Sequence, residues 1–146
     1  TPIQVLLWYG ALALNNDEAV GAPHIVDYIE DPNTVEDAKY IETRPALPAM
    51  FAGYGKTQET LRAAFAGAAE AYKLKSDKLK AIYAKTGTAT QPDGKNTVLL
   101  AFSFITLSGG SYAGVVSCSN TEKTSAILKP IARSLIKTAL ELGVVE

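Results

Sequence analysis

The stretch Lys85-Thr86-Gly87-Thr88-Ala89 decides how this chain is organised. It lies in a run from 81 to 90 that is rich in β-branched and aromatic residues, which is typical of a β-strand. A basic residue, two hydroxyls and a glycine in successive positions suit the capture of an anionic substrate. The sequence therefore predicts a strand that carries chemistry on an exposed edge.

Two further strand-like runs follow, at 97 to 107 and at 111 to 119. Residues typical of turns separate the runs, with Pro92-Asp93-Gly94 after the first and Ser108-Gly109-Gly110 after the second. Because such short connections join antiparallel neighbours, we expect a three-stranded antiparallel sheet. The middle run is apolar on both alternating faces, which predicts that helices cover both sides of the sheet.

Helical spacing of apolar residues predicts those helices. The first should begin at Thr1-Pro2, where threonine can cap and proline suits the first turn, and it should be buried because it is apolar around most of its circumference. The predicted helices span 2–14, 59–76 and 126–142, with a short strand at 23–29 and a long irregular connection from 31 to 56. The predicted fold class is α+β, an antiparallel sheet covered by helices, in a single partial domain of residues 1–146.

Composition excludes several classes of protein. Of the 146 residues, 47% are hydrophobic and 20% are charged, which is ordinary for a globular domain. A net charge of −1 provides no basic field for nucleic acid. No uninterrupted apolar run approaches the roughly 18 residues that a membrane-spanning helix needs. The opening residues also lack the basic segment of a signal peptide, so none is expected.

Three isolated features carry no strong functional signal. Cys118 is the only cysteine and is expected to be a buried strand residue, since no base is near it in the sequence. His24 is the only histidine, and no second ligand accompanies it. The segment Gly53-Tyr54-Gly55-Lys56-Thr57 matches the tail of a phosphate-binding loop, but Met50 stands where a glycine is needed. We therefore expect no metal, no nucleotide and no cofactor.

Two motifs resemble those of the penicillin-binding proteins, the serine D,D-transpeptidases of bacterial cell-wall synthesis. Lys85-Thr86-Gly87-Thr88-Ala89 matches the K-T-G-T-A strand of that family, and Thr1-Pro2-Ile3-Gln4 is similar to the T-P-L-Q helix start that precedes it in high-molecular-weight members. The last predicted helix, with Pro130 in its early part, also resembles the C-terminal helix of the family. The resemblance covers the whole chain in layout and implies the C-terminal portion of a β-lactamase/transpeptidase-like fold.

The resemblance implies a role for each residue of the motif. Lys85 would keep the site electropositive and join its proton-transfer network. The hydroxyls of Thr86 and Thr88 would bind the carboxylate of a D-alanyl terminus, or of a β-lactam that mimics it, and Gly87 would let the substrate lie close to the strand. The backbone N–H of Thr88 would form half of the oxyanion hole. The implied catalytic residues are thus Lys85 and Thr88, with Thr86, Gly87 and Thr88 binding substrate.

The chain departs from the family in the motifs that it lacks. The family requires S-x-x-K and S-x-N before the K-T-G strand, and neither occurs upstream of Lys85. Ser76-Asp77-Lys78 has a lysine in place of the amide, and Ser134-Leu135-Ile136-Lys137 fits S-x-x-K by chance, after the strand. We therefore expect a fragment of a transpeptidase domain that supplies the carboxylate-binding strand without a nucleophile, and that is inactive alone.

The resemblance also implies partners and a location. The intact parent would acylate on a serine and cross-link peptidoglycan stem peptides outside the cytoplasm, in a bacterial cell envelope, from a membrane anchor. This chain would pair with the N-terminal remainder of the transpeptidase domain, or self-associate through the sheet edge near Ser111 to Ser119. Two alternatives stay open: a fragment of a serine β-lactamase or β-lactam sensor, and a non-catalytic binding or assembly module.

Overall fold

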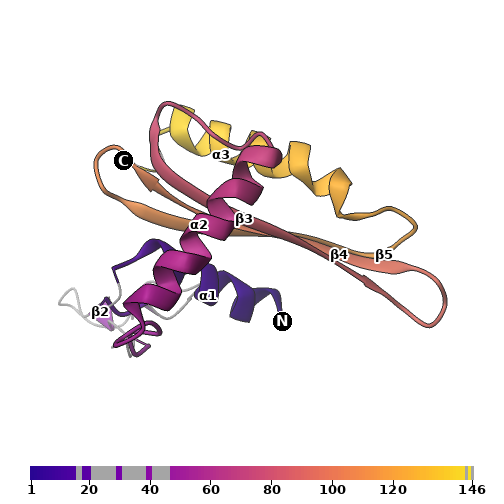
Figure 1. Cartoon of the computed structure of the whole chain (residues 1–146), viewed down its shortest axis with the longest axis horizontal. Helices are drawn as coiled ribbons and strands as arrows, with labels where there is room; N and C mark the ends of the chain where they lie inside the picture. The colour runs from indigo at the N-terminus through magenta and orange to yellow at the C-terminus, as the bar shows by residue number, and fades with distance from the viewer. Residues whose placement is uncertain (16–17, 21–28, 31–38, 41–46, 144, 146) are drawn as a thin grey trace.

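The computed structural model of the chain describes residues 1–15, 18–20, 29–30, 39–40, 47–143 and 145. Within these residues the elements combine helices with antiparallel strands, which confirms the predicted α+β class (Figure 1). In chain order they are α1 (Pro2–Ala13), β1 (Ile29–Glu30), β2 (Lys39–Tyr40), α2 (Gly55–Ala71), β3 (Leu79–Thr90), β4 (Asn96–Thr106), β5 (Ser111–Thr121), the 3-10 helix η1 (Ser125–Ile127) and α3 (Leu128–Glu141).

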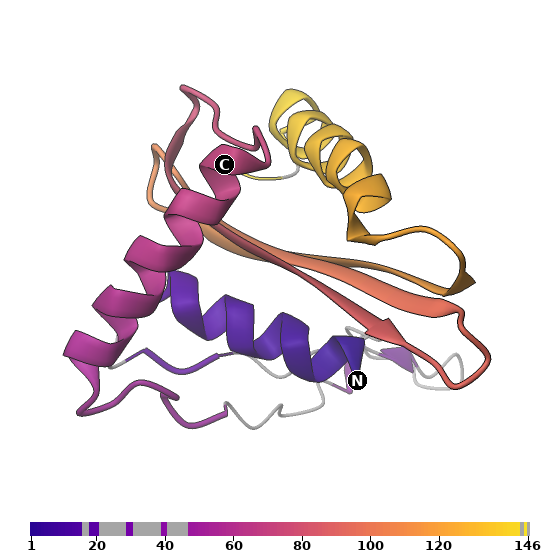
Figure 2. The ribbon, with the colours of Figure 1, turned by 45° about the vertical axis from the view of Figure 1, so that its right-hand side comes forward.

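The three long strands form an antiparallel sheet in the order β3-β4-β5, as predicted from the two turn sequences. β3 and β5 are therefore the outer strands of the described sheet. α3 covers one face of the sheet and α1 covers the other (Figure 2). α2 packs against the outer strand β3. The expectation that helices cover both faces is thus confirmed.

Two apolar cores separate on the two faces of the sheet because neighbouring strand residues point to opposite sides. On one face, Leu100 and Phe102 of β4 pack with Leu128 of α3. On the other, Ala101 of β4 packs in the cluster that holds Tyr9 of α1. Burial raises the pKa of the Tyr9 phenol above its usual range, and the neighbouring Tyr72 adds to the effect, so this hydroxyl stays protonated.

The first helix begins where the sequence predicts but is less buried than expected. Thr1 and Gln4 form a capping box, in which the Thr1 hydroxyl accepts from the Gln4 backbone N–H and the Gln4 side chain accepts from the Thr1 amine. The buried residues all lie in the second half of α1, whereas Ile3 is 58% exposed. Its apolar circumference is therefore only partly covered by the described residues, which corrects the expectation of a buried helix.

Two side chains of α2 close the C-terminal end of α1. The buried Gln58 amide donates to the carbonyls of Ala11 (3.2 Å) and Leu14 (2.8 Å). The Arg62 guanidinium, one turn later, donates to the carbonyls of Leu12 (2.7 Å), Ala13 (3.3 Å) and Leu14. The last carbonyls of a helix have no partner within the helix, and a cation favours that end of the dipole. Gln58 and Arg62 therefore fix the angle at which the two helices meet.

The boundaries of α2 differ from the prediction, which placed it at 59–76. It begins earlier, at Gly55, and ends earlier, at Ala71. Lys73 adopts a left-handed conformation (φ 57°) and the Leu74 N–H bonds back to the Ala69 carbonyl, which is a typical way for a helix to end. The reason is burial, because this turn places Leu74 in the core under α3, where it is 3% exposed.

The last helix agrees with the sequence. Pro130 lies in the first turn of α3, where the missing N–H costs no hydrogen bond, and Gly143 follows the helix with φ 64°. Most of the strand predicted at 23–29, including His24, lies outside the described residues, and only Ile29 is seen in a strand, β1. The region predicted as irregular contains the short β2.

Candidate functional site

The Lys85–Ala89 motif lies in the second half of β3, on an outer strand of the described sheet. Thr86 and Thr88 point to the face that α3 covers, and Lys85, Gly87 and Ala89 point to the opposite face, as the alternation of β3 requires. Thr86 is half-buried, whereas the other residues of the motif are exposed. The structure therefore brings all the predicted site residues to one accessible segment.

The hydrogen-bond ladder shows which backbone groups of the motif are available. At the β3–β4 turn, the Gln91 N–H donates to the Lys95 carbonyl (2.6 Å), which makes these residues a hydrogen-bonded pair. Such pairs alternate along an antiparallel ladder, so the N–H and C=O groups of Thr86 and Thr88 point away from β4. A side-chain contact agrees, because the exposed Lys85 ammonium donates to the Thr86 carbonyl (2.8 Å). The Thr88 N–H thus faces the outer edge of β3.

Both threonine hydroxyls are held by neighbours from the α3 side. The Thr86 hydroxyl shares a hydrogen bond of 3.0 Å with the Tyr72 hydroxyl, at the end of α2. The Thr88 hydroxyl accepts from the backbone N–H of Ser125, the first residue of η1, at 3.3 Å. These partners were not predicted from the sequence, because they come from segments that meet β3 only in the folded chain.

Gly87 lies in open space. A Cβ atom built on it meets no atom of the described residues within 4 Å, and its φ angle is not in the left-handed region. The conformation and the packing of the described chain therefore do not require a glycine at this position. The opposite holds at Gly114 in β5, where the same test places the Cβ atom 2.3 Å from the ring of Phe102. Because Gly87 is part of an outer strand and has no side chain, a ligand can approach its backbone closely.

The residues that could have supplied a nucleophile lie elsewhere. Ser134 is exposed on α3, and Lys137 of the same S-x-x-K match pairs with Glu141 (3.6 Å). The buried face of α3 is formed instead by Leu128, Ala132 and Ile136, so Ser134 points away from the sheet. Cys118 is half-buried in β5 and not fully buried as predicted. Within the described residues, neither side chain lies against the Lys85–Ala89 motif.

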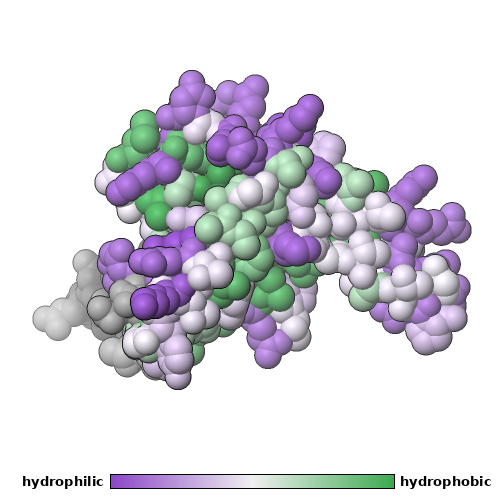
Figure 3. All heavy atoms as spheres, in the orientation of Figure 1, coloured by the Kyte–Doolittle hydropathy of each residue, from purple (hydrophilic) through white to green (hydrophobic). Residues whose placement is uncertain are grey.

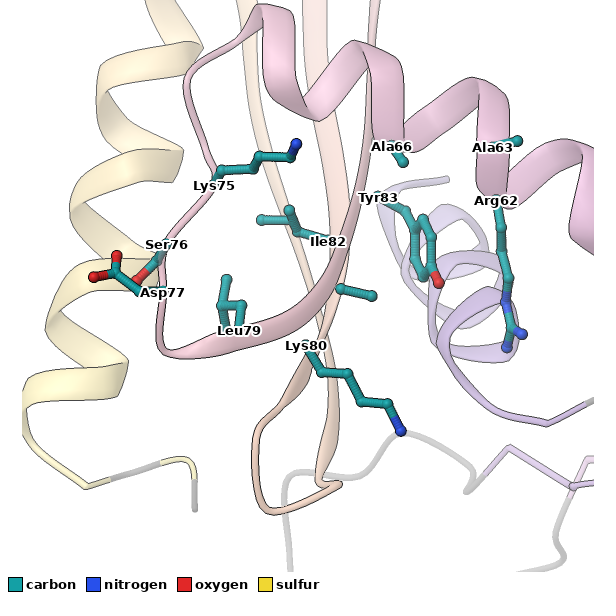
Figure 4. Close-up of a pocket in the computed structure, with 11 residues that line it drawn as sticks. Arg62, Ala63, Ala66, Lys75, Ser76, Asp77, Leu79, Lys80, Ile82 and Tyr83 are labelled. Atoms are coloured by element: carbon teal, nitrogen blue, oxygen red, sulfur yellow. The ribbon is translucent and has the colours of Figure 1, made fainter.

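A cavity of about 640 Å³ lies beside the first half of β3 and does not include the motif. Arg62, Lys75 and Lys80 bring positive charge to its walls, and Tyr83 lines it from β3 (Figure 4). Two of these cations already have partners, because Arg62 holds the end of α1 and Lys75 pairs with Glu70 (3.3 Å). Ser76 and Asp77 point away from Arg62, towards α3 (Figure 4). Among its described lining residues the cavity therefore presents positive charge but no nucleophile paired with a base.

No family model matches the chain, and no curated protein matches it. No helix among the described residues has the length and apolar character needed to cross a membrane. The same part of the chain contains no cluster of three or more histidine, cysteine or acidic side chains that could hold a metal ion.

Proposed function

We propose that this chain is the C-terminal part of a serine D,D-transpeptidase domain of the penicillin-binding type, and that it supplies one wall of the active site. The observation that carries the proposal is the Lys85–Ala89 motif on an outer strand, with the Thr88 N–H directed at the free edge. The open space over Gly87 supports it, since a substrate strand needs that space. A K-T-G-T-A sequence buried in mid-sheet would have argued against it.

The chemistry assigned to this wall is binding and charge stabilisation. The hydroxyls of Thr86 and Thr88 donate to the carboxylate of a D-alanyl terminus, or to the carboxylate of a β-lactam, which only accepts hydrogen bonds. The Thr88 N–H stabilises the oxyanion that forms when a serine attacks the substrate carbonyl. Lys85 provides the positive charge next to these groups. The serine itself belongs to the remainder of the domain, so this chain alone forms no acyl-enzyme.

The same proposal assigns a place and partners to the intact protein. It acts on peptidoglycan stem peptides at the outer side of a bacterial cytoplasmic membrane, to which the parent is anchored. Nucleic acid is not a partner. Apolar side chains reach the surface where the C-terminal end of α3 lies near the β4–β5 turn, including Leu107 (69% exposed) and Leu142 (72% exposed), and the rest of the domain would cover part of this surface (Figure 3).

Titration with N-acetyl-D-alanyl-D-alanine, followed by the backbone amide resonances of the chain, tests the proposed site. We expect the amides of Thr86, Gly87 and Thr88 to shift on binding, and Thr86→Val to weaken the affinity because valine keeps the shape but removes the donor. Gly87→Ala should not lower stability, since the added Cβ atom has space, yet it should weaken ligand binding because it occupies that space. Shifts that avoid the motif, or equal affinity in all three proteins, would reject the site.

The outer edge of β5 gives a second prediction, that the isolated chain associates with itself. β5 has 11 residues, none of them charged, and charges or prolines are what usually protect an exposed edge. The Thr106 N–H donates to the Gly110 carbonyl, so by alternation the exposed Ser117 directs its N–H away from β4. Ser117→Pro removes this outward donor without breaking the β4–β5 ladder.

Sedimentation measures the outcome. We expect the unmodified chain to form dimers or larger species as its concentration rises, and Ser117→Pro to remain monomeric. Ser117→Ala, which keeps the N–H, is the matched control and should associate as before. A chain that stays monomeric without any substitution would contradict this prediction.

A further inference from the structure

Tyr72 connects three parts of the molecule beside the Lys85–Ala89 motif. It is the residue that ends α2, and its hydroxyl lies 3.0 Å from the Thr86 hydroxyl. The Lys129 ammonium of α3 lies over the face of its ring, 4.6 Å from the centroid. Arg133, one turn later in α3, donates to the carbonyls of Tyr72 (3.0 Å) and Lys73 (3.1 Å). The half-buried Tyr72 therefore contacts α3 through its backbone carbonyl and its ring, while its hydroxyl contacts β3.

The shared hydrogen bond constrains how Thr86 can serve a ligand. A hydroxyl has one O–H to donate, and a carboxylate accepts hydrogen bonds without donating any. If Thr86 donated to Tyr72, it would have no proton for a carboxylate. When Tyr72 donates instead, the Thr86 oxygen is satisfied as an acceptor and its O–H is free to point at the ligand.

We propose that Tyr72 is a positioning residue that donates to the Thr86 hydroxyl and so fixes its O–H for a carboxylate ligand at the outer edge of β3. This inference rests on the proposed function, because it concerns the same carboxylate site.

The neighbouring threonine is held in the same way by a different donor. The Thr88 hydroxyl accepts from the Ser125 N–H, so its proton is also left for another acceptor. Both donors approach from the face of the sheet that α3 covers. The end of α2 and the start of η1 thus prepare two O–H donors, spaced two residues apart on one face of β3, for a single acceptor group.

A double-mutant cycle separates this role from a structural one. The affinity for N-acetyl-D-alanyl-D-alanine is measured for the unmodified chain, Tyr72→Phe, Thr86→Val and the double variant. We expect Tyr72→Phe to weaken binding about three- to tenfold, the effect of one neutral hydrogen bond. The double variant should bind as weakly as Thr86→Val alone, because Tyr72 acts through Thr86. A ligand that lacks the terminal carboxylate, N-acetyl-D-alanyl ethylamide, should bind Tyr72→Phe and the unmodified chain equally.

Arg133→Met is the matched control, since it cuts the contact between α2 and α3 at the Tyr72 backbone but keeps the phenol. It should leave the affinity unchanged. If Thr86→Val weakens binding and Tyr72→Phe does not, or if the two effects add, the role of Tyr72 is wrong and the carboxylate site stands. A loss with Arg133→Met as large as that with Tyr72→Phe also overturns the positioning role. If Thr86→Val has no effect, the proposed function itself fails.

Discussion

Replacing Gly114 with valine is expected to lower the free energy of unfolding by about 3 kcal/mol, and replacing it with alanine by about 1–3 kcal/mol. Gly114 pairs with Phe102 across β4 and β5, and the Phe102 ring lies over its backbone. A Cβ atom there would be 2.3 Å from the tip of the ring, so the ring has to move. Phe102 is 4% exposed and packs in the core under α3, which limits that movement. Urea unfolding measures the change.

Gly67→Ala is the matched control. Gly67 lies in α2, and a Cβ atom added there meets no described atom within 4 Å. Because glycine is unfavourable inside a helix, alanine should stabilise the protein by up to about 1 kcal/mol. Phe102→Leu should recover part of the loss in Gly114→Ala, since it removes the ring that collides. Equal stability of Gly114→Val and the unmodified chain would mean that the ring does not lie over β5.

Replacing Arg62 with methionine should destabilise the protein by about 2–4 kcal/mol. The guanidinium donates to three successive carbonyls at the end of α1, and part-buried carbonyls left without a donor are costly. Methionine keeps the apolar stem of the side chain, so the change reports the lost donors. Arg62→Lys keeps the charge but not the planar fork and should lose about half as much.

Arg133→Met provides the comparison in an exposed setting. Its guanidinium also donates to two backbone carbonyls at a helix end, those of Tyr72 and Lys73, but these contacts are open to solvent. Water can replace an exposed donor, so we expect a loss below about 1 kcal/mol. Circular dichroism in urea gives both values. A loss for Arg133→Met equal to that for Arg62→Met would show that burial of the α1 terminus is not the cause.

The sequence is most informative where the structural signal is local. The three strands of the sheet follow from Pro92-Asp93-Gly94 and Ser108-Gly109-Gly110, because turn residues act over a few positions. The start of α1 follows from Thr1 as a cap and Pro2 in the first turn for the same reason. The end of α2 could not be predicted in this way. The left-handed conformation of Lys73 ends the helix and places Leu74 in a core with strand residues that come later in the sequence.

The candidate site divides in the same way. The residues Lys85 to Ala89 are recognisable in the sequence, since five consecutive residues form the motif. Their arrangement around the edge is not, because it depends on the ladder with β4 and on Tyr72 and Ser125, which reach β3 only after folding. The contacts of Gln58 and Arg62 with α1 could not be predicted either. Their partners are backbone carbonyls, which every residue has, so no residue type in the sequence indicates them.

Covalent labelling by a tagged penicillin tests the central claim most directly. Residues 1–146 are compared with the same chain extended by the polypeptide encoded immediately upstream. The account predicts no label on residues 1–146, and a label on a serine of the added segment in the extended chain. Lys85→Ala in the extended chain should slow labelling about 100-fold or more, as expected for loss of a group in the proton-transfer network. A label on residues 1–146 alone, Ser134 included, or an extended chain that takes no label, would contradict the account.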